Sequence, residues 1–465
     1  MRLPYCNSLF KEEGIVGGVD KVRLGDGEYV RIEGPAMVEV LRGSLYLLGA
    51  RYEAGDKVTI LRARRIVAKA IGDTELSLVF GPGGFADKPK AGEEMIDEWD
   101  SKLNINLKGS VLVVMGAMDS GKTTITTMLV NKAASMGLKV GVVDADPGQN
   151  DLGPPTTIAC SVLKGGRITH LSFMIPLKQV FIGSTNLEGN WYRAVHAVTK
   201  LVNYLRDREG ADLIIINTDG WVEGEGAIEY KRTLVAAVKP SYVIVMRKGD
   251  EVNGLVKGLS QWNTLILNAP PSMRVRDRND RKIHRDMGYG RYLSPSRDLT
   301  LSLSRVNVVN MPLTGRRLDE NLARLISTYL KVKPIYVDAL KNMVMVVSGS
   351  VKEPTLRSIP GGVALILQPN WENGLLVGLE DEDGFLVSLA VLRRIYYNTG
   401  KIVVTVPRRL SNAELASVRS IRVGSIRVNE QFEEVDKFSI IYRVERALRE
   451  SDAGKGLEVG ADHPG

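Results

Sequence analysis

The pattern of apolar and polar positions divides the chain into three regions of different texture. Up to about residue 95, short apolar runs are separated by glycine-containing turns, as in 38–63, VEVLRGSLYLLGARYEAGDKVTILRA. Short strands separated by turns indicate an antiparallel β domain, so we expect a β-sandwich-like fold over residues 1–95. The polar, Gly/Pro-rich stretch 80–94 is typical of a linker.

Residues 96–332 alternate between strand and helix patterns. Apolar residues recur at helical spacing in 124–136 and 188–206. Continuous apolar runs, the mark of strands buried on both faces, occur at 110–115, 139–146, 178–183, 212–217, 241–246 and 263–268. This alternation predicts an α/β core, with a doubly wound and mostly parallel sheet.

Residues 333–450 return to short apolar runs and predict a C-terminal β-rich domain. Its aromatic residues Trp371, Tyr396 and Tyr397 could serve an RNA surface or the core, and the core interpretation is favoured. The last segment, 451–465, has little to bury, so we expect it to be disordered.

Composition narrows the class of protein. The 44% hydrophobic and 25% charged content is that of a globular chain. Two widely spaced cysteines argue against a disulfide framework or a zinc ribbon, and no segment resembles a signal peptide or a membrane span. Scarce glutamine, with no targeting segment and no nuclear-type basic tail, favours a prokaryotic, archaeal cytoplasm, or the nucleus if the source is a eukaryote. The net charge of +8 fits a polyanionic partner, and equally a basic surface that binds nothing.

A phosphate-binding motif follows the first strand of the core. GAMDSGKTT has the spacing G-x-x-x-x-G-K-T between a predicted strand and a predicted helix, which is the context of a P-loop. Lys122 is expected to reach the β- and γ-phosphates of a nucleotide, and the Thr123 hydroxyl to hold Mg²⁺. The candidate nucleotide-binding residues are Gly116, Asp119, Ser120, Gly121, Lys122, Thr123 and Thr124.

Two carboxylates lie at the end of the next strand, in Asp144-Ala-Asp146-Pro-Gly-Gln149. We expect this strand to lie beside the P-loop strand, which would bring its carboxyl end to the edge of the nucleotide cleft. Alternation along a strand points Asp144 and Asp146 the same way. One could bind Mg²⁺ through water and the other could accept a proton from an attacking hydroxyl. The alternative is that one of them only braces the loop.

Another motif, Thr218-Asp-Gly-Trp221, follows the strand 212–217. Trp221 at the end of a strand could stack on a flat ring, and Gly220 would let backbone N–H groups approach a phosphate. The alternative is a tryptophan that only packs under a loop.

Basic residues are concentrated in 272–297. From Arg274 onward this segment holds eight Lys/Arg against three Asp, an excess that would suit a lid closing over a triphosphate. Arg281 and Arg285 share one face if the segment is helical, although Arg278 and Arg281 could form the pair instead. The alternative is a solvated, salt-bridged helix.

The chain resembles the polynucleotide 5′-hydroxyl kinases of RNA processing. The motifs that carry the resemblance occur in this order: GAMDSGKTT, DADPGQ, GST (183–185), TDGW and the Arg-rich segment. That family is also tripartite, so the resemblance covers nearly the whole chain. It implies transfer of the γ-phosphate of ATP, with Mg²⁺, to the 5′-hydroxyl of single-stranded RNA or DNA. It also implies that other RNA-processing proteins are partners, and it leaves the oligomeric state open.

The resemblance implies roles for particular residues. Asp146 matches the general base, and Asp144 an acidic position with a water-mediated contact to Mg²⁺. Arg281 and Arg285 match the arginines of the lid. The acceptor strand would be gripped by Thr218, Gly220 and Trp221, with help from Gln149 and Asp144.

Two other functions remain open at this point. One is a nucleotide-gated scaffold subunit of an RNA-processing complex, although the intact Lys122, Thr123, Asp146 and Trp221 argue against it. The other is a P-loop ATPase or GTPase of the partition or targeting type, which would need neither Trp221 nor the Arg-rich lid.

Overall fold

A computed structural model of the chain describes residues 19–90, 92–271, 277–311, 313, 319–340 and 343–438. The expected disordered segment 451–465 and the first basic residues of the expected lid, Arg274 and Arg276, lie outside the described residues. The chain divides into two compact units. The first runs up to Gly153 and includes Ile158–Gln179 and Asn186–Asp277; the second comprises Pro154–Thr157, Val180–Thr185 and the chain from Arg278 onward.

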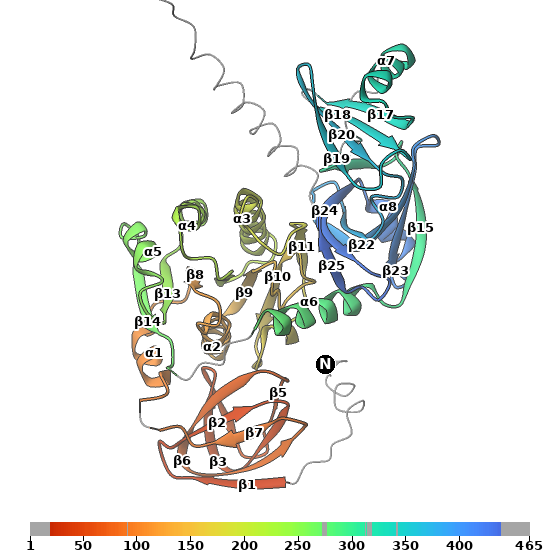
Figure 1. Ribbon diagram of the computed structural model, residues 1–465. Coiled ribbons are helices and arrows are strands. Elements are labelled where there is room, and N and C mark those ends of the chain that lie inside the picture. The colour runs from red at the N-terminus through yellow and green to blue at the C-terminus, as the bar shows by residue number, and fades with distance from the viewer. Residues whose placement is uncertain are drawn as a thin grey trace, which may run out of the picture. The chain divides into compact units, whose positions relative to one another are not determined.

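The first unit begins with one seven-stranded antiparallel sheet in the order β4-β3-β6-β2-β7, with β1 paired to β6 and β5 to β3 (Figure 1). Alternate side chains of the long strand β6 are buried, as expected for a sheet with one face on a core. The strands are β1 (Val19–Leu24), β2 (Tyr29–Glu33), β3 (Ala36–Leu47), β4 (Ala50–Glu53), β5 (Lys57–Ile60), β6 (Arg65–Phe80) and β7 (Phe85–Asp87).

The rest of the first unit is built on a mostly parallel sheet in the order β11-β10-β9-β12-β8-β13-β14. Its strands are β8 (Val111–Gly116), β9 (Lys139–Ala145), β10 (Thr157–Lys164), β11 (Lys178–Phe181), β12 (Leu213–Thr218), β13 (Tyr242–Arg247) and β14 (Thr264–Asn268). Every residue of β8 and of β12 is buried, which explains their continuous apolar runs.

Helices cover both faces of this sheet: Figure 1 shows α2 on one side and α3 and α4 on the other. The helices are α1 (Ile96–Lys102), α2 (Lys122–Ser135), the short 3₁₀ turn η1 (Leu171–Phe173), α3 (Trp191–Asp207), α4 (Glu225–Val238) and α5 (Asn253–Gly258). The N-terminal sheet packs on α2: the Asn131 amide donates to the carbonyl of Leu48, and a Cβ at Gly49 would lie 2.3 Å from the Met128 carbonyl oxygen.

One expectation about the sheet is wrong. The strand after the P-loop does not lie beside the P-loop strand, because β12 pairs in parallel with both β8 and β9 and separates them. The end of β12, where Thr218 to Trp221 begin, therefore lies between the P-loop and the carboxylates that follow β9.

The second unit contains two sheets in the orders β15-β23-β22-β21-β24-β16 and β17-β18-β20-β19, with β25 paired to β24. Most strand pairs are antiparallel, but β16 and β24, and β18 and β20, pair in parallel. The strands are β15 (Ser296–Ser302), β16 (Asn307–Val309), β17 (Pro334–Leu340), β18 (Met343–Ser348), β19 (Thr355–Ile359), β20 (Gly362–Leu367), β21 (Leu375–Glu380), β22 (Leu386–Tyr396), β23 (Lys401–Pro407), β24 (Ser420–Val428) and β25 (Glu434–Lys437).

The described residues of this unit form the helices α6 (Arg278–Leu293), α7 (Glu320–Leu330) and α8 (Asn412–Ser417). Trp371 is buried and its indole N–H donates to the Tyr397 hydroxyl at 2.9 Å, while Tyr396 is exposed. The strands β15 and β16 fall inside the range expected for the kinase core, yet they pair with strands of the C-terminal sheet.

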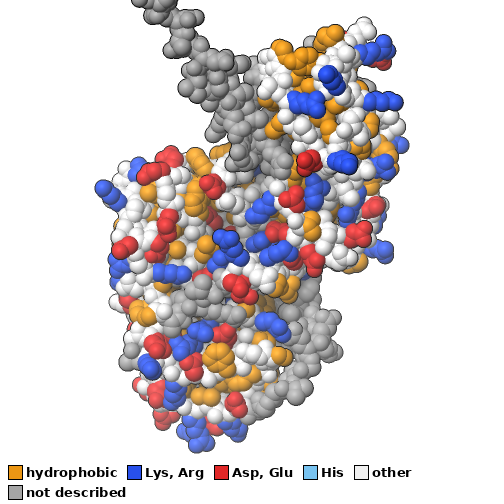
Figure 2. All heavy atoms as spheres, in the orientation of Figure 1, with side chains coloured by type: hydrophobic (Ala, Val, Ile, Leu, Met, Phe, Trp, Pro, Cys, Tyr) orange, Lys and Arg blue, Asp and Glu red, His pale blue; other side chains and the backbone are white. Residues whose placement is uncertain are grey.

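The expected fold class is confirmed: a central, mostly parallel α/β sheet is flanked in sequence by N- and C-terminal β sheets. Lys/Arg and Asp/Glu side chains are interspersed over the face seen in Figure 2. No helix within the described residues is both long and apolar enough to cross a membrane.

Candidate active site

The P-loop leaves β8 through a tightly curled backbone that needs glycine. Gly116 has φ +147°, and a Cβ there would lie 2.7 Å from both the Met246 carbonyl oxygen and the Ser120 hydroxyl. Gly121, at the start of α2, has φ +98°. The Ser120 hydroxyl is buried and has no hydrogen-bond partner within the described residues. A buried polar group without a partner costs free energy, so the loop is suited to an incoming polar ligand such as a phosphate.

Lys122 is the first residue of α2, and its ammonium donates to the carbonyl oxygen of Ala117 in the same loop at 2.8 Å. Burial lowers the pKa of Lys122 to about 8; the Asp146 carboxylate opposes this shift and the Lys231 ammonium adds to it. A phosphate in the loop would replace a weak carbonyl partner with a charged one. Thr123 and Thr124 follow on the first turn and are partly exposed.

Asp144 is completely buried near the end of β9. Its two carboxylate oxygens accept hydrogen bonds from the Asp151 backbone N–H at 2.7 Å and from the Asn217 amide at 3.1 Å. Burial raises the pKa of Asp144 well above its usual range, and the nearby Asp151 carboxylate adds to the effect. Asn217 faces Asp144 across the β9–β12 pair, so the position of this carboxylate is set by strand register.

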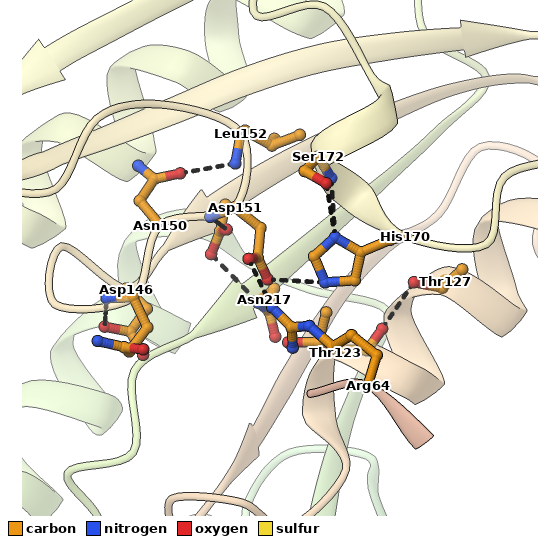
Figure 3. A network of polar contacts seen from close by, with 12 residues as sticks. Arg64, Thr123, Thr127, Asp146, Asn150, Asp151, Leu152, His170, Ser172 and Asn217 are labelled. Carbon is orange, nitrogen blue, oxygen red and sulfur yellow. Dashed lines mark hydrogen bonds and ion pairs between the residues drawn. The ribbon is translucent and has the colours of Figure 1, made fainter. Parts of the chain in front are cut away.

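A second carboxylate, Asp151, connects the core to the N-terminal domain (Figure 3). Asp151 lies between Arg64, whose guanidinium is 2.9 Å away, and His170, whose Nε2 is 3.4 Å away. Arg64 comes from the segment before β6 and His170 from the segment before η1. The segment after Asp146 is therefore held by contacts of Asp151 to Asp144, Arg64 and His170, although its sequence contains prolines and glycines.

Asp146 lies one residue beyond β9 and uses its two carboxylate oxygens differently. Oδ1 accepts the backbone N–H groups of Gly148 at 2.9 Å and Gln149 at 3.0 Å, which braces the turn. Oδ2 accepts no hydrogen bond within the described residues, and the side chain is partly exposed. Burial raises the pKa of Asp146, and the Asp219 carboxylate raises it further, while Lys122 opposes both. Asp146 thus braces the loop and still presents a basic oxygen.

The loop after β12 lies against the P-loop. The Thr218 hydroxyl donates to the Val114 carbonyl of β8 at 3.0 Å. A Cβ at Gly220 would lie 2.4 Å from Met118 Cγ and 2.8 Å from the Met118 backbone nitrogen, so only glycine allows this approach. Next to Gly220, the partly exposed indole of Trp221 stacks on the buried ring of Tyr230, with centroids 6.1 Å apart and planes at 21°.

Comparisons with known proteins agree with this geometry. Residues 116–294 match the family described as mRNA cleavage and polyadenylation factor CLP1 P-loop. A polyribonucleotide 5′-hydroxyl-kinase of Thermococcus kodakarensis is 31% identical over 345 residues, which cover 74% of this chain and 95% of that protein. The chain belongs to the Clp1 P-loop family of polyribonucleotide 5′-hydroxyl-kinase homologues.

Other members show how far the similarity extends. A polyribonucleotide 5′-hydroxyl-kinase of Methanocaldococcus jannaschii is 28% identical over 326 residues, or 70% of this chain and 88% of that protein. Among solved structures, a Clp1p–Pcf11p complex contains a chain with a TM-score of 0.56 and 12% identity, over 88% of this chain and 98% of that one. That structure supports the fold alone. The central part of this Clp1-family chain is thus a P-loop NTPase domain.

The residues expected to form a lid belong to the second unit, and those of the P-loop belong to the first. Helix α6 forms over most of the basic segment and carries both Arg281 and Arg285. Arg285 forms a two-pronged ion pair with Glu434, at 3.0 and 2.6 Å, in which both side chains are largely buried. The Tyr289 hydroxyl donates to the same carboxylate at 3.1 Å. The role of Arg285 in a lid therefore stays a prediction, since the residue already has an anionic partner.

Two residues of this Clp1-family site were not predicted from the sequence. Asp219 forms a buried ion pair with Lys231 of α4 at 2.7 Å. The charges of both residues shift the pKa of Lys122, and Asp219 also raises the pKa of Asp146. Asp146 in turn raises the pKa of Lys231. Asp219 could have been noticed as the one charged residue of TDGW. Lys231 gave no such signal, because a lysine in a helical pattern is normally taken as solvated.

The site also fits a hard divalent cation such as Mg²⁺. A carboxylate and a hydroxyl, from Asp144 and Thr123, are oxygen ligands of the kind Mg²⁺ prefers. A cation would favour the ionised form of Asp144, whose pKa is raised by burial and by the Asp151 carboxylate. Both Asp144 oxygens already accept hydrogen bonds, which favours contact through water. Among the described residues, no group of three or more His, Cys, Asp or Glu could hold a metal ion.

Proposed function

We propose that this chain is an ATP-dependent polynucleotide 5′-hydroxyl kinase that phosphorylates single-stranded RNA, with DNA as an alternative acceptor. The observation that carries the proposal is the free Oδ2 of Asp146. Asp146 is partly exposed, its pKa is raised, and its carboxylate interacts with the charge of the P-loop lysine, so it is suited to accept a proton from an attacking hydroxyl. A hydrolase of the partition or targeting type would not need the aromatic platform at Trp221.

In the proposed reaction, the 5′-oxygen of the acceptor attacks the γ-phosphorus of ATP. The new O–P bond forms as the bond between that phosphorus and the β–γ bridging oxygen breaks, and ADP leaves. The proton of the hydroxyl goes to Oδ2 of Asp146, which Oδ1 keeps in place through the backbone of Gly148 and Gln149. Lys122 exchanges the Ala117 carbonyl for phosphate oxygens, and the Ser120 hydroxyl finds its missing partner there.

Mg²⁺ bound near Thr123 and Asp144 would supply positive charge to the phosphates. Arg281 on α6 is the second proposed source of positive charge, and Arg285 the third if it exchanges Glu434 for a phosphate. Closure of a basic helix over the triphosphate would bring this charge in only when the acceptor is bound.

The acceptor is proposed to be single-stranded because its terminal base must reach the indole of Trp221. One face of that ring is occupied by Tyr230, and the residue keeps exposed surface for a second ring. The chain resembles archaeal proteins named polyribonucleotide 5′-hydroxyl-kinases. This resemblance supports RNA as the proposed acceptor and a prokaryotic cytoplasm as the proposed setting.

A second candidate function is a nucleotide-gated scaffold subunit, with RNA-processing proteins as partners. A chain of this fold has been solved in a Clp1p–Pcf11p complex, at 12% identity to this chain. In that case the protein would bind ATP and a partner without turning ATP over. Oδ2 of Asp146, which accepts no hydrogen bond within the described residues, would then have no role in a reaction.

One assay separates these functions. The protein is incubated with γ-labelled ATP, Mg²⁺ and a 5′-hydroxyl oligoribonucleotide, next to the same oligonucleotide carrying a 5′-phosphate. We expect label on the first oligonucleotide only, and none on either with Asp146→Asn. ATP binding without transfer would favour the scaffold. Release of free phosphate that ignores the oligonucleotide would overturn the proposal in favour of an ATPase.

A further inference from the structure

A lysine is completely buried beneath the loop that follows β12. Lys231, on α4, is 0% exposed, and its ammonium donates to Oδ2 of Asp219 at 2.7 Å and to the Asp219 backbone carbonyl at 3.3 Å. The Asp219 side chain is only 9% exposed. Burying both charges is costly, and a well-packed apolar pair in the same place is often as stable or more so. The pair therefore calls for a reason other than stability.

Asp219 uses its second oxygen to hold the next aromatic residue. Oδ1 accepts the backbone N–H of Trp221 at 2.8 Å, while Oδ2 is held by Lys231. The carboxylate is thus a bridge between the helix α4 and the backbone of Trp221. If Asp219 rotated, Trp221 would lose this hydrogen bond.

Tyr230, the residue before Lys231, holds Trp221 through its aromatic ring. Tyr230 is buried, stacks on the Trp221 indole, and has Trp191 6.4 Å away on a tilted plane. The Lys231 ammonium lies 4.5 Å from the Tyr230 ring centroid. Two consecutive residues of α4 therefore fix Trp221, one through its backbone and one through its ring.

The same segment lies close to the P-loop. Gly220, between Asp219 and Trp221, has no space for a Cβ because Met118 is in contact with it. Asp219 and Trp221 are therefore joined by a residue that packs on the P-loop.

We propose that the buried Asp219–Lys231 pair is a positioning device, which holds the Trp221 indole in the orientation that receives the terminal base of the acceptor strand. This rests on the proposed kinase function and adds two residues to the acceptor site. Neither residue touches the acceptor; both act through Trp221. Asp219 and Lys231 act on the charge of Lys122 in opposite directions, so we expect removal of both together to weaken binding of the nucleic acid and to leave binding of ATP nearly unchanged.

Two double variants test the pair without leaving a buried charge alone. Asp219→Ala with Lys231→Met removes both charges and the acceptor for the Trp221 N–H. Asp219→Asn with Lys231→Met also removes both charges, but keeps an oxygen at the Oδ1 position. Glu33→Ala with Arg65→Met breaks another partly buried ion pair, 2.8 Å long, in the N-terminal sheet and serves as the matched control.

Steady-state kinetics give the first measurement. We expect the Ala/Met variant to raise the KM for a 5′-hydroxyl oligoribonucleotide on the order of tenfold, the scale of a lost base stack. The KM for ATP should stay within about twofold of wild type. The Asn/Met variant should recover most of the oligonucleotide affinity, and the control should not change it. Equal rises in both KM values, or no rise for the oligonucleotide, would overturn the proposal.

Hydrogen exchange gives a second measurement that does not depend on activity. The Trp221 amide should be protected in the wild type and in the Asn/Met variant, and should exchange faster in the Ala/Met variant. If the wild type phosphorylates no oligonucleotide but shows this pattern, the kinase function fails while the positioning of Trp221 stands. Equal Trp221 exchange in all variants would overturn the positioning itself.

Discussion

The ammonium of Lys122 donates a hydrogen bond to the carbonyl oxygen of Ala117, five residues earlier in the same loop. A lysine held only by a neutral oxygen in a buried place is easily deprotonated, and its pKa is lowered to about 8. The loop is thus arranged so that the charge of Lys122 is best satisfied by an anion.

The affinity for a nucleotide triphosphate should therefore depend on pH. Below pH 8 the lysine is charged and affinity is full; as pH rises above 8 the free protein loses this proton, and affinity should fall by up to ~10-fold per pH unit. Titration with a non-hydrolysable ATP analogue from pH 7 to 9.5 measures this. Lys122→Arg, which stays charged, should give a flat profile. A flat profile for the wild type would contradict the prediction.

Replacement of Asp146 by Asn should abolish transfer while preserving the loop. An amide oxygen can still accept the N–H groups of Gly148 and Gln149, but the side chain can no longer take a proton. We expect kcat to fall by about 10²–10⁴-fold, with the Kd for ATP within about twofold of wild type. Single-turnover kinetics with saturating ATP measure the loss. Near-normal turnover would remove Asp146 from the role of base.

Replacement of Trp221 should separate the two substrates. Trp221→Ala removes the ring that would stack on a base, so the affinity for a 5′-hydroxyl oligoribonucleotide should fall by roughly 1–3 kcal/mol. The affinity for ATP should not change, because nucleotide contacts come from the P-loop. Trp221→Phe keeps a smaller ring on Tyr230 and should lose less. Fluorescence anisotropy with a 3′-labelled oligonucleotide measures both variants, and equal losses for ATP and RNA would indicate a purely structural tryptophan.

Gly220 tests the contact between the P-loop and the Trp221 loop. Gly220→Ala would place a Cβ 2.8 Å from the Met118 backbone nitrogen, so one of the two loops must move. We expect both ATP and oligonucleotide binding to weaken, unlike the selective loss in Trp221→Ala. Gly25→Ala is the matched control, since its new Cβ would meet nothing closer than 3.9 Å. Isothermal titration of each ligand measures the outcome, and unchanged binding of both would show that the contact is not needed.

Much of the core fold could be predicted because buried parallel strands have continuous apolar runs. The runs at 110–115 and 212–217 correspond to β8 and β12, each completely buried. The antiparallel strand β10 was not predicted, since TIACSVLK mixes small, polar and charged residues. The order of strands could not be predicted either: β12 lies between β8 and β9 through long-range pairing, which local periodicity does not encode.

The candidate site could be predicted where a motif fixes the local backbone, and not where burial decides. Gly116, Lys122 and Asp146 lie close together because a loop and two strand ends determine their place. Lys231 could not be found in the same way, because only its tertiary surroundings make it a buried charge. The partner of Arg285 is likewise 149 residues further along the chain.

That ion pair gives the last prediction, which asks whether Arg285 serves the fold or the reaction. Arg285 and Glu434 are both largely buried, so Arg285→Ala leaves a buried carboxylate unpaired and should lower the free energy of unfolding by about 3–5 kcal/mol. Glu434→Ala should cost a similar amount, and the double variant less than the two losses together.

Arg281, which is partly exposed on the same helix, is the matched comparison. Arg281→Ala should lower kcat and change the denaturation midpoint less than Arg285→Ala does, because Arg285→Ala leaves the buried Glu434 carboxylate unpaired and the proposed charge of Arg281 acts on the phosphates. Denaturant unfolding and single-turnover kinetics of the four variants separate these effects. Glu434→Ala keeps Arg285, and Arg285→Ala removes it at a similar cost in stability. If Glu434→Ala retains wild-type kcat and Arg285→Ala does not, Arg285 also acts on the phosphates. If both variants keep wild-type kcat, Arg285 is a structural residue of the second unit and Arg281 alone remains as the lid arginine.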